Sequence, residues 1–496
     1  MTAYLAAAPS EAKARQNKSA GFVVSFPLPD GSEGKFSVWE APVMAPGLAA
    51  KYPELKTYAG KGIDDKTATI RFDITPAGLH AQILSAAGAQ YIDPYTLENT
   101  SYHISYNRTD LPARNSAAAC GFLPQPDPEL ENNTALANAA ALARQLQLVS
   151  NGTNLRTYRL ALSCTGEYAA YHGGTVAGAL AAMVVSINRV NGIYERELAI
   201  RMELVENNDT LIFLSSTSDP FSNSNGGTML SQNQTVTDQR IGGANYDIGH
   251  VFSTGGGGIA SLGVPCRGGM KAKGVTGLNN PIGDAFDVDY VAHEMGHQFG
   301  AQHTFNGTTG SCNGNRSSST AYEPGSGSTI MAYAGICTSN NISPKSSPYF
   351  HSASFNQIVT YTTNGFGNTC PVITPTGNTP PDVDAGDSYY VPYLTPFRLM
   401  ANASDPDGDS VTYCIEQVDL GPGGYALSPS GNAPIFRSFD PVPDNFRYFP
   451  ALPKVVTNTQ VIGEMLPSYQ RLMHFRVTAR DNNAVGAVSY NNSSIT

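Results

Sequence analysis

Charged residues are scarce in this chain, and basic residues are fewer than acidic ones. Charged residues make up 14% of the 496 residues, with 30 Lys and Arg against 40 Asp and Glu, for a net charge of −10. Binding to nucleic acid or to an anionic membrane needs a basic surface, so this balance argues against both partners. No apolar run approaches the ~20 residues that span a bilayer. We therefore expect no nucleic-acid partner and no membrane span.

Cysteine is also sparse. The chain has seven cysteines, and an odd number means that at least one thiol is unpaired or pairs between chains. Together with the few Lys and Arg and the many Asn, Ser, Thr and Gly residues, this composition favours an exported protein, secreted or at the cell surface. The first eight residues lack the basic region of a signal peptide, and the sequence leaves open whether a signal has been removed.

Three of only nine histidines lie together in residues 293–303, which read H-E-x-x-H-x-x-G-x-x-H. His293 and His297 are one helical turn apart, so one helix face presents both imidazoles to a single zinc ion. Gly300 lets the backbone leave the helix and bring His303 as a third ligand. A fourth position then stays open for water, and Glu294 can act on that water as general base. The alternative is a helix whose histidines are only packed or hydrogen-bonded.

A second stretch, residues 328–335, reads S-T-I-M-A-Y-A-G. Together with the zinc motif it resembles the metzincin metallopeptidases, whose Met-turn places a methionine under the three histidines. By this resemblance, Met331 is the methionine that lies under the three histidines. It also puts Tyr333 where some metzincin families carry a tyrosine that approaches the zinc or the reaction oxyanion. An ordinary core methionine and a buried structural tyrosine are the alternatives.

Residues 155–373 resemble a reprolysin (adamalysin) catalytic domain of the bacterial secreted type. The resemblance implies an α/β fold with a twisted mixed sheet and an active-site helix. Thr304 stands where adamalysins usually carry an aspartate, and the His-Thr-Phe run is closer to the pappalysins. The expected strands are 157–163, 198–205, 210–214 and 246–252, and the expected helices are 169–190 and 354–363.

A glycine-rich segment precedes the zinc helix. The resemblance implies that it forms the sheet edge that pairs with the backbone of an extended substrate. A flexible glycine loop is the alternative. The residues expected on this edge are Gly258, Ile259, Ala260 and Ser261.

Acidic residues lie just ahead of the zinc helix. We expect them to cap the free helix amides rather than to bind a metal. They are Asp284, Asp287 and Asp289.

The resemblance also bears on the cysteines. Cys266 and Cys370 lie where adamalysins join the region before the zinc helix to the end of the domain. Cys312 and Cys337 flank the Met-turn loop and can pair. Cys164 is expected to be a buried thiol. None of these connectivities follows from sequence alone.

The N-terminal residues 1–107 alternate apolar and polar positions, as at Phe22, Val24 and Phe26, which predicts a β-rich domain. Ahead of a secreted protease, such a domain is most simply a propeptide. Residues 108–154 are predicted to be a connector. There Cys120 resembles a short form of the cysteine switch of the matrixins, in which a thiolate fills the open zinc position. A disulfide or an idle thiol is the alternative.

A Pro-rich linker at 374–381 precedes residues 382–496, whose short strands resemble an Ig-like or cadherin-like β-sandwich. The sequence leaves open whether this module is complete. An acidic turn in it either binds Ca²⁺ or is a plain Asp/Gly turn. Its residues are Asp405, Asp407 and Asp409. Because every expected catalytic residue precedes the linker, a chain ending near Ile373 is expected to keep the peptidase site.

The sequence thus predicts a secreted zinc endopeptidase, made as a latent zymogen, that acts on a protein or peptide. Glu294 is its general base, and zinc, with calcium as a further candidate, is its metal. Two alternatives stay open. One is an adhesion or glycan-binding protein with an inactive protease domain, and the other is a zinc hydrolase of a non-peptide amide.

Overall fold

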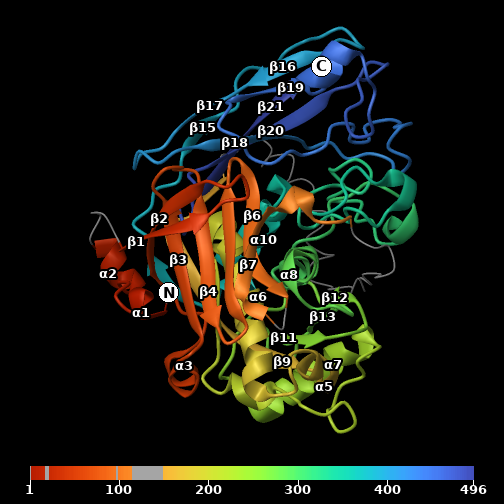
Figure 1. Cartoon of the computed structure of the whole chain (residues 1–496). Coiled ribbons are helices and arrows are strands. Elements are labelled where there is room, and N and C mark those ends of the chain that lie inside the picture. The colour runs from red at the N-terminus through yellow and green to blue at the C-terminus, as the bar shows by residue number, and fades with distance from the viewer. Residues whose placement is uncertain (1, 17–21, 97–98, 114–148, 496) are drawn as a thin grey trace.

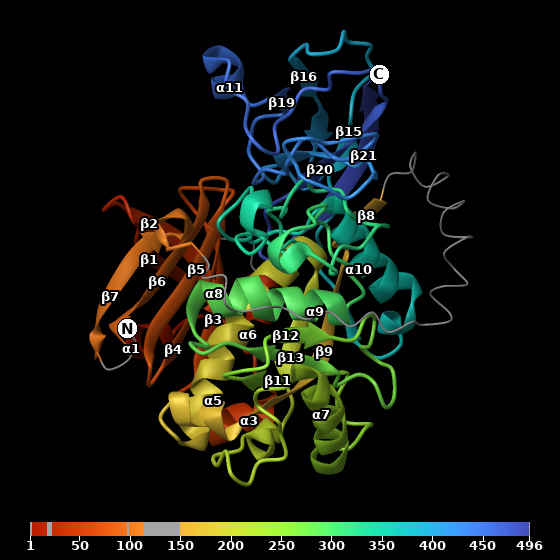
Figure 2. The same ribbon diagram turned by 90° about the vertical axis from the view of Figure 1, so that its right-hand side faces the viewer.

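The computed structural model describes residues 2–16, 22–96, 99–113 and 149–495. Three parts succeed one another along the chain (Figure 1). An N-terminal sheet, in red and orange, lies beside a central α/β part in yellow and green. A β-rich C-terminal part, in blue, lies above both, and Figure 2 shows the same arrangement from the side.

The N-terminal sheet has seven antiparallel strands in chain order. The predicted alternation is present, because Val24, Phe26, Phe36 and Val38 are all buried in one core on this sheet. Three short helices accompany it, α1 (Thr2–Leu5), α2 (Glu11–Gln16) and α3 (Pro46–Lys51). The strands are β1 (Phe22–Pro27), β2 (Glu33–Glu40), β3 (Lys56–Gly62), β4 (Thr69–Thr75), β5 (Gly78–Ser85), β6 (Gly88–Thr96) and β7 (Asn99–Asn107).

The central part is built on a mixed sheet of order β10-β9-β11-β13-β12. The first four strands run parallel, and β12 is antiparallel at the edge, while β14 pairs with the start of β9. The mixed α/β sheet is therefore as predicted. Its strands are β9 (Asn154–Cys164), β10 (Ile200–Leu204), β11 (Ile248–Ser253), β12 (Gly258–Ala260), β13 (Gly274–Gly277) and β14 (Val372–Pro375).

Two predictions of secondary structure in this part are wrong. The single helix expected over 169–190 is two helices, α5 (Gly166–Tyr171) and α6 (Val176–Leu198). Gly173 and Gly174 separate them with φ of 88° and 67°, a conformation that suits glycine and ends a helix. The strand expected over 210–214 is instead a 3₁₀ turn, η2 (Asn208–Leu211), followed by a single bridge from Ile212 to Cys164. The remaining long helices are α7 (Gly226–Arg240) and α10 (Ser352–Asn364).

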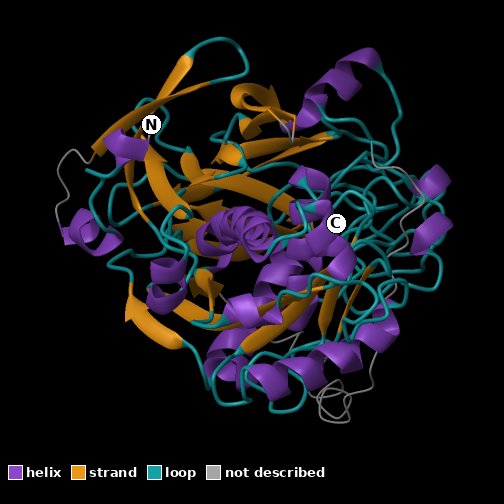
Figure 3. Cartoon of the chain, turned by 60° about the horizontal axis from the view of Figure 1, so that its bottom comes forward, coloured by secondary structure: helices purple, strands orange, loops and turns teal. Residues whose placement is uncertain are grey.

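Helix α6 passes through the middle of the molecule. It contacts β3, β4 and β5 of the N-terminal sheet and β9 and β10 of the central sheet. Figure 3 shows strands on both sides of the central helices. By length and composition α6 would suffice to cross a membrane, yet 78% of its apolar stretch is buried inside the fold. Its apolar character is therefore accounted for by the core.

Buried charges join the N-terminal sheet to the central part. Arg71 on β4 pairs with Glu195 on α6, and both are nearly inaccessible. Arg189 on α6 pairs with Asp93 on β6 and, at 3.2 Å, with Asp287. A carboxylate buried in this way needs its partner, so the two parts form one connected unit.

The acidic residues ahead of the zinc helix belong to this interface. They lie in the first turns of short helices, as expected, but the capping hydrogen bonds expected for them are absent. No side chain caps α8 (Gly283–Phe286) or the π-helical turn η3 (Asp287–Ala292). Instead Asp284 accepts a hydrogen bond from the Tyr91 hydroxyl at 2.5 Å and lies 3.3 Å from the Arg108 Nε. Asp289 accepts a hydrogen bond from the Ser346 amide. Burial raises the pKa of Asp287 to about 6.

The C-terminal part has a four-stranded antiparallel sheet of order β18-β20-β21-β8. Its fourth strand, β8 (Val149–Asn151), comes from the segment just before the central sheet. Its core includes the packed rings of Phe436, Phe449 and Phe475. The elements are β15 (Asp382–Asp384), β16 (Phe397–Met400), β17 (Asn402–Ser404), β18 (Thr412–Gln417), β19 (Phe446–Phe449), α11 (Leu452–Thr457), β20 (Met473–Arg480) and β21 (Val488–Ile495).

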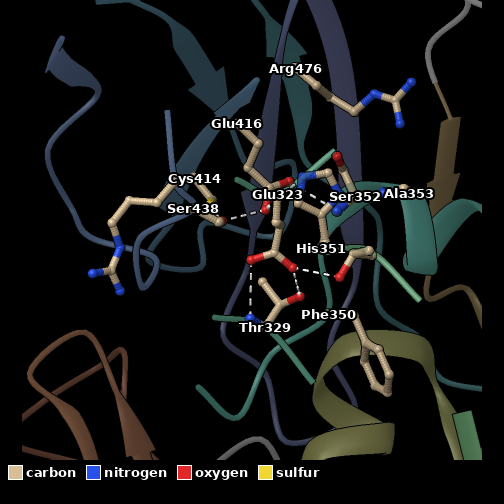
Figure 4. Close-up of polar contacts among 12 residues, drawn as sticks. Glu323, Thr329, Phe350, His351, Ser352, Ala353, Cys414, Glu416, Ser438 and Arg476 are labelled. Atoms are coloured by element: carbon tan, nitrogen blue, oxygen red, sulfur yellow. Dashed lines mark hydrogen bonds and ion pairs between the residues drawn. The ribbon is translucent and has the colours of Figure 1, made fainter. Parts of the chain in front are cut away.

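Buried polar contacts fasten this C-terminal part to the central one. The Arg480 guanidinium donates to both carboxylate oxygens of Glu197 at 2.8 to 3.0 Å, with side chains 1% and 3% exposed. Nearby, Glu416 accepts a hydrogen bond from the Ser352 amide and lies 3.8 Å from His351 (Figure 4). A chain ending near Ile373 would lack Arg480 and so leave Glu197 without this partner. These contacts lead us to predict that the central part depends on the C-terminal part, whereas the sequence predicted that a chain ending near Ile373 keeps its site.

Arg480→Met should therefore destabilise the protein strongly. Removing one partner of a buried ion pair costs about 3–5 kcal/mol. Lys56→Met is the control, because the Lys56–Glu40 pair is 41% and 34% exposed and an exposed pair contributes less than about 1 kcal/mol. Calorimetric melting of the full chain measures both. Equal melting temperatures for the two variants would contradict the dependence on Arg480.

Candidate metal centre

The short helix α9 (His293–Gln298) carries the first two histidines of the motif, and every one of its residues is buried. The Tyr194 hydroxyl on α6 donates to the Ala292 carbonyl at 2.8 Å and so fixes the start of α9. Gly300 has a φ of 99°, which only glycine adopts readily, and there the chain turns away. The helix, its end and the turn toward His303 are as predicted.

The three histidines converge on one point. Their Nε2 atoms lie 3.0 to 3.2 Å from one another. Tetrahedral zinc with nitrogens at ~2.0–2.1 Å would set them roughly 3.3 Å apart. The spacing therefore fits a zinc ion held by His293, His297 and His303, which are also the histidines that form the metal-ligand group among the described residues.

Each ring is oriented by a backbone carbonyl. The Nδ1 atoms of His293, His297 and His303 lie 2.6 to 2.7 Å from the carbonyl oxygens of Ile330, Ala301 and Asn315. A carbonyl only accepts, so each Nδ1 carries the proton and each Nε2 presents a lone pair to the centre. Three lone pairs that face one another in this way suit a cation between them. Burial also lowers the pKa of His297 to about 4, in keeping with a neutral ring.

Glu294 lies between the histidines and the sheet edge. A Cβ placed on Gly258 would lie 2.2 Å from the Glu294 Oε1, so the carboxylate rests directly against β12. The side chain is buried, and burial raises the pKa of its carboxyl. A raised pKa makes a carboxylate a better proton acceptor near neutral pH. Of the four predicted edge residues, Gly258, Ile259 and Ala260 form β12 and Ser261 comes directly after it.

Met331 lies beneath the histidines. A Cβ on Gly296, the residue between Met295 and His297, would lie 2.4 Å from the Met331 sulfur. The thioether therefore occupies the space that this glycine leaves on α9, and Met331 is fully buried. This contact explains why position 296 is glycine and why a methionine follows in the Met-turn. The sequence pattern alone had offered no reason for Gly296.

Tyr333 packs against the same cluster. Its ring centroid lies 4.5 Å from that of His303 and 5.7 Å from that of His293, and its side chain is buried. Phe305 completes this aromatic group at 4.5 Å from Tyr333. Sequence reasoning placed Tyr333 near the histidines but missed Phe305, the second residue after His303.

Both disulfides that the sequence suggested are present. Cys266 bonds Cys370, and Cys312 bonds Cys337 beside the Met-turn. Cys164 is a buried free thiol, as expected. Cys120, the candidate zymogen switch, lies outside the described residues.

The acidic turn of the C-terminal part has protein partners for each carboxylate. Asp405 accepts hydrogen bonds from the amides of Asp407 and Asp409 at 2.9 and 3.0 Å. Asp407 accepts one from the Thr379 amide, and Asp409 pairs with Lys61 of the N-terminal sheet. The amide contacts of Asp405 are those of an Asp/Gly turn, whereas its Oδ2 atom is buried without a hydrogen-bond partner. Calcium binding there stays a prediction.

Comparison with known proteins agrees with this geometry. Residues 154–362 match the family described as metallo-peptidase family M12B, reprolysin-like. The comparison with curated proteins found no match for the chain.

Gly296→Ala should disturb the floor of the site. The added methyl would collide with the Met331 sulfur, and overpacking of this kind costs about 1–3 kcal/mol. We expect a lower melting temperature of the metal-free chain and weaker zinc binding, measured by calorimetry and by titration. Gly268→Ala is the control, because a Cβ there meets nothing within 4 Å. If both variants matched the parent, the contact between Met331 and α9 would not support the site.

Proposed function

Because residues 154–362 form a reprolysin-like metzincin domain, we propose that the protein is a secreted zinc endopeptidase that cleaves peptide bonds within proteins or peptides. The observation that carries the proposal is the convergence of three neutral histidines beside a buried glutamate at a sheet edge. This set supplies three ligands and a base, which a peptidase needs and an inactive adhesion module does not. The alternatives of an adhesion protein and of a non-peptide amide hydrolase are less favoured by the family match.

The proposed roles derive from the positions of the side chains. Zinc held by the three histidines would supply Lewis acidity, polarising the scissile carbonyl and lowering the pKa of water. Glu294 takes a proton from the attacking water and delivers it to the leaving amine. Tyr333, whose ring packs on His293 and His303, borders the place where negative charge develops on the carbonyl oxygen.

Strand β12 is the proposed docking edge for the substrate. It pairs with β13 on one side and ends the described path of the sheet, so its other side can accept an extended peptide. Gly258 places this edge against Glu294. A peptide added to β12 would therefore bring its backbone to the base without requiring a particular side chain.

Latency is the second component of the proposal. Buried charge pairs hold the N-terminal sheet on α6, through Arg71–Glu195 and Asp93–Arg189. Arg108, directly after the last strand of this sheet, pairs with Asp284 in the segment just before the zinc helix. A propeptide attached at this place suits a protease kept inactive until it is processed. Two disulfides suit an extracellular protein.

Glu294→Gln should abolish hydrolysis while keeping the metal. The amide has the shape of the carboxylate but cannot accept the proton, so we expect kcat to fall by at least about 100-fold. Metal analysis should still find one zinc per chain, because Glu294 is not a ligand. His303→Ala is the comparison variant and should lose zinc as well. Cleavage of a casein substrate by Glu294→Gln at the parent rate would refute the mechanism.

Cys120→Ala tests the latency mechanism. If the Cys120 thiolate fills the open zinc position, the unprocessed variant should cleave peptides while the unprocessed parent does not. Cys164→Ala is the control, because that thiol is buried in the core and free. Equal latency of the unprocessed Cys120→Ala variant and parent, with zinc bound in both, would assign the block to another part of the chain.

A further inference from the structure

A carboxylate that sequence reasoning did not single out lies behind the zinc ligands. Glu323 belongs to the loop between His303 and the Met-turn, and its side chain is 1% exposed. The ion pairs found among the described residues do not include it. Figure 4 shows this carboxylate directed at Thr329, with dashed lines to its donors.

The donors around Glu323 come from two segments. The Thr304 hydroxyl donates to Oε1 at 2.6 Å, and the Thr329 hydroxyl donates to the same oxygen at 2.5 Å. The amides of Ser328 and Thr329 donate to Oε2 at 2.7 and 3.2 Å, and the Ser328 hydroxyl donates at 3.3 Å. Five hydrogen bonds thus hold the Glu323 carboxylate in place of an ion pair.

Both segments carry groups that fix the zinc ligands. Thr304 comes directly after His303, and its amide donates to the Met331 carbonyl at 3.1 Å. Thr329 directly precedes Ile330, whose carbonyl accepts the hydrogen bond from the His293 Nδ1 at 2.7 Å. The Glu323 carboxylate therefore links the residue after the ligand His303 to the residue before Ile330. The Ile330 carbonyl is the one that orients the ligand His293.

The backbone around Glu323 is shaped to this contact. The Glu323 amide donates to the Thr304 carbonyl, and the Asn306 amide donates to the Glu323 carbonyl, both at 2.8 Å. Gly325 and Gly327 have φ of 57° and 66°. A Cβ on Gly327 would lie 2.6 Å from the Ala332 Cβ and 3.1 Å from the Glu323 Cδ, so glycine at this position lets the loop pack closely over the carboxylate.

We propose that Glu323 is a positioning residue of the zinc centre, which sets the geometry of His303 and His293 by joining Thr304 to the Met-turn. The inference rests on the proposed function, because it assumes that these histidines bind zinc.

Zinc affinity of the metal-free full chain tests this role. Glu323→Gln keeps the shape but turns an NH₂ toward donors, so we expect zinc to bind 10–100-fold more weakly, the loss typical for partners that orient metal ligands. Thr304→Val should weaken zinc binding, and Thr304→Ser should restore it, because serine keeps the hydroxyl. Competition with a chromophoric chelator gives the affinities, and the absorption of the Co²⁺-substituted chain reports ligand geometry.

The melting temperature of each metal-free variant distinguishes an effect on the geometry of the zinc ligands from an effect on the stability of the fold. A purely structural role would lower that temperature and leave the zinc affinity of the folded fraction unchanged, which would overturn the inference. If Glu323→Gln does not fold, the Thr304 pair decides: equal affinities of Thr304→Val and Thr304→Ser overturn it, and weaker binding by Thr304→Val alone supports it. A parent chain that binds no zinc overturns the proposed function itself, whereas unchanged variants of a zinc-binding parent overturn only the role of Glu323.

Discussion

Three imidazole nitrogens within 3.2 Å of one another, buried and each presenting a lone pair, form the constraint on which the central part of this protein depends. Such an arrangement is costly unless a cation lies between the nitrogens and unless each ring is held from behind. The carbonyls of Ile330, Ala301 and Asn315 meet the second requirement. This need shapes the loops after α9, because they must bring those carbonyls to the rings.

The floor and the wall of the site depend on two glycines. Gly296 leaves space for the Met331 sulfur under the helix, and Gly258 leaves space for the Glu294 carboxylate beside β12. Neither glycine is needed for its own backbone conformation, since neither has a positive φ. Close approach of another residue explains both glycines, so at these two positions glycine is required by packing.

On a larger scale, buried charges organise the molecule. Helix α6 carries Glu195 toward the N-terminal sheet and Glu197 toward the C-terminal part. A buried charge without its partner is strongly unfavourable, so each pair makes the central part sensitive to the presence of its neighbours.

The sequence by itself determined the features that depend on local spacing. Two histidines one turn apart, a glutamate beside the first and a glycine three residues after the second define the zinc motif, because helix periodicity and glycine conformation act over a few residues. Alternation along β1 and β2 was likewise readable, since one face of a strand is buried. The break between α5 and α6 at Gly173 and Gly174 was not predicted, because the apolar run through that region favoured one helix.

Only the tertiary structure decided what meets the motif from a distance. Asp284 lies beside the zinc helix in sequence, yet Tyr91 and Arg108 of the N-terminal segment take its oxygens, so no cap forms. Glu323 receives donors from Thr304 and Thr329, and Glu197 receives Arg480 from 283 residues away. The sequence also does not indicate which backbone carbonyls orient the histidines, because every residue type has a carbonyl. Contacts between residues far apart in the sequence depend on how whole helices and strands pack. Local sequence patterns do not show that packing.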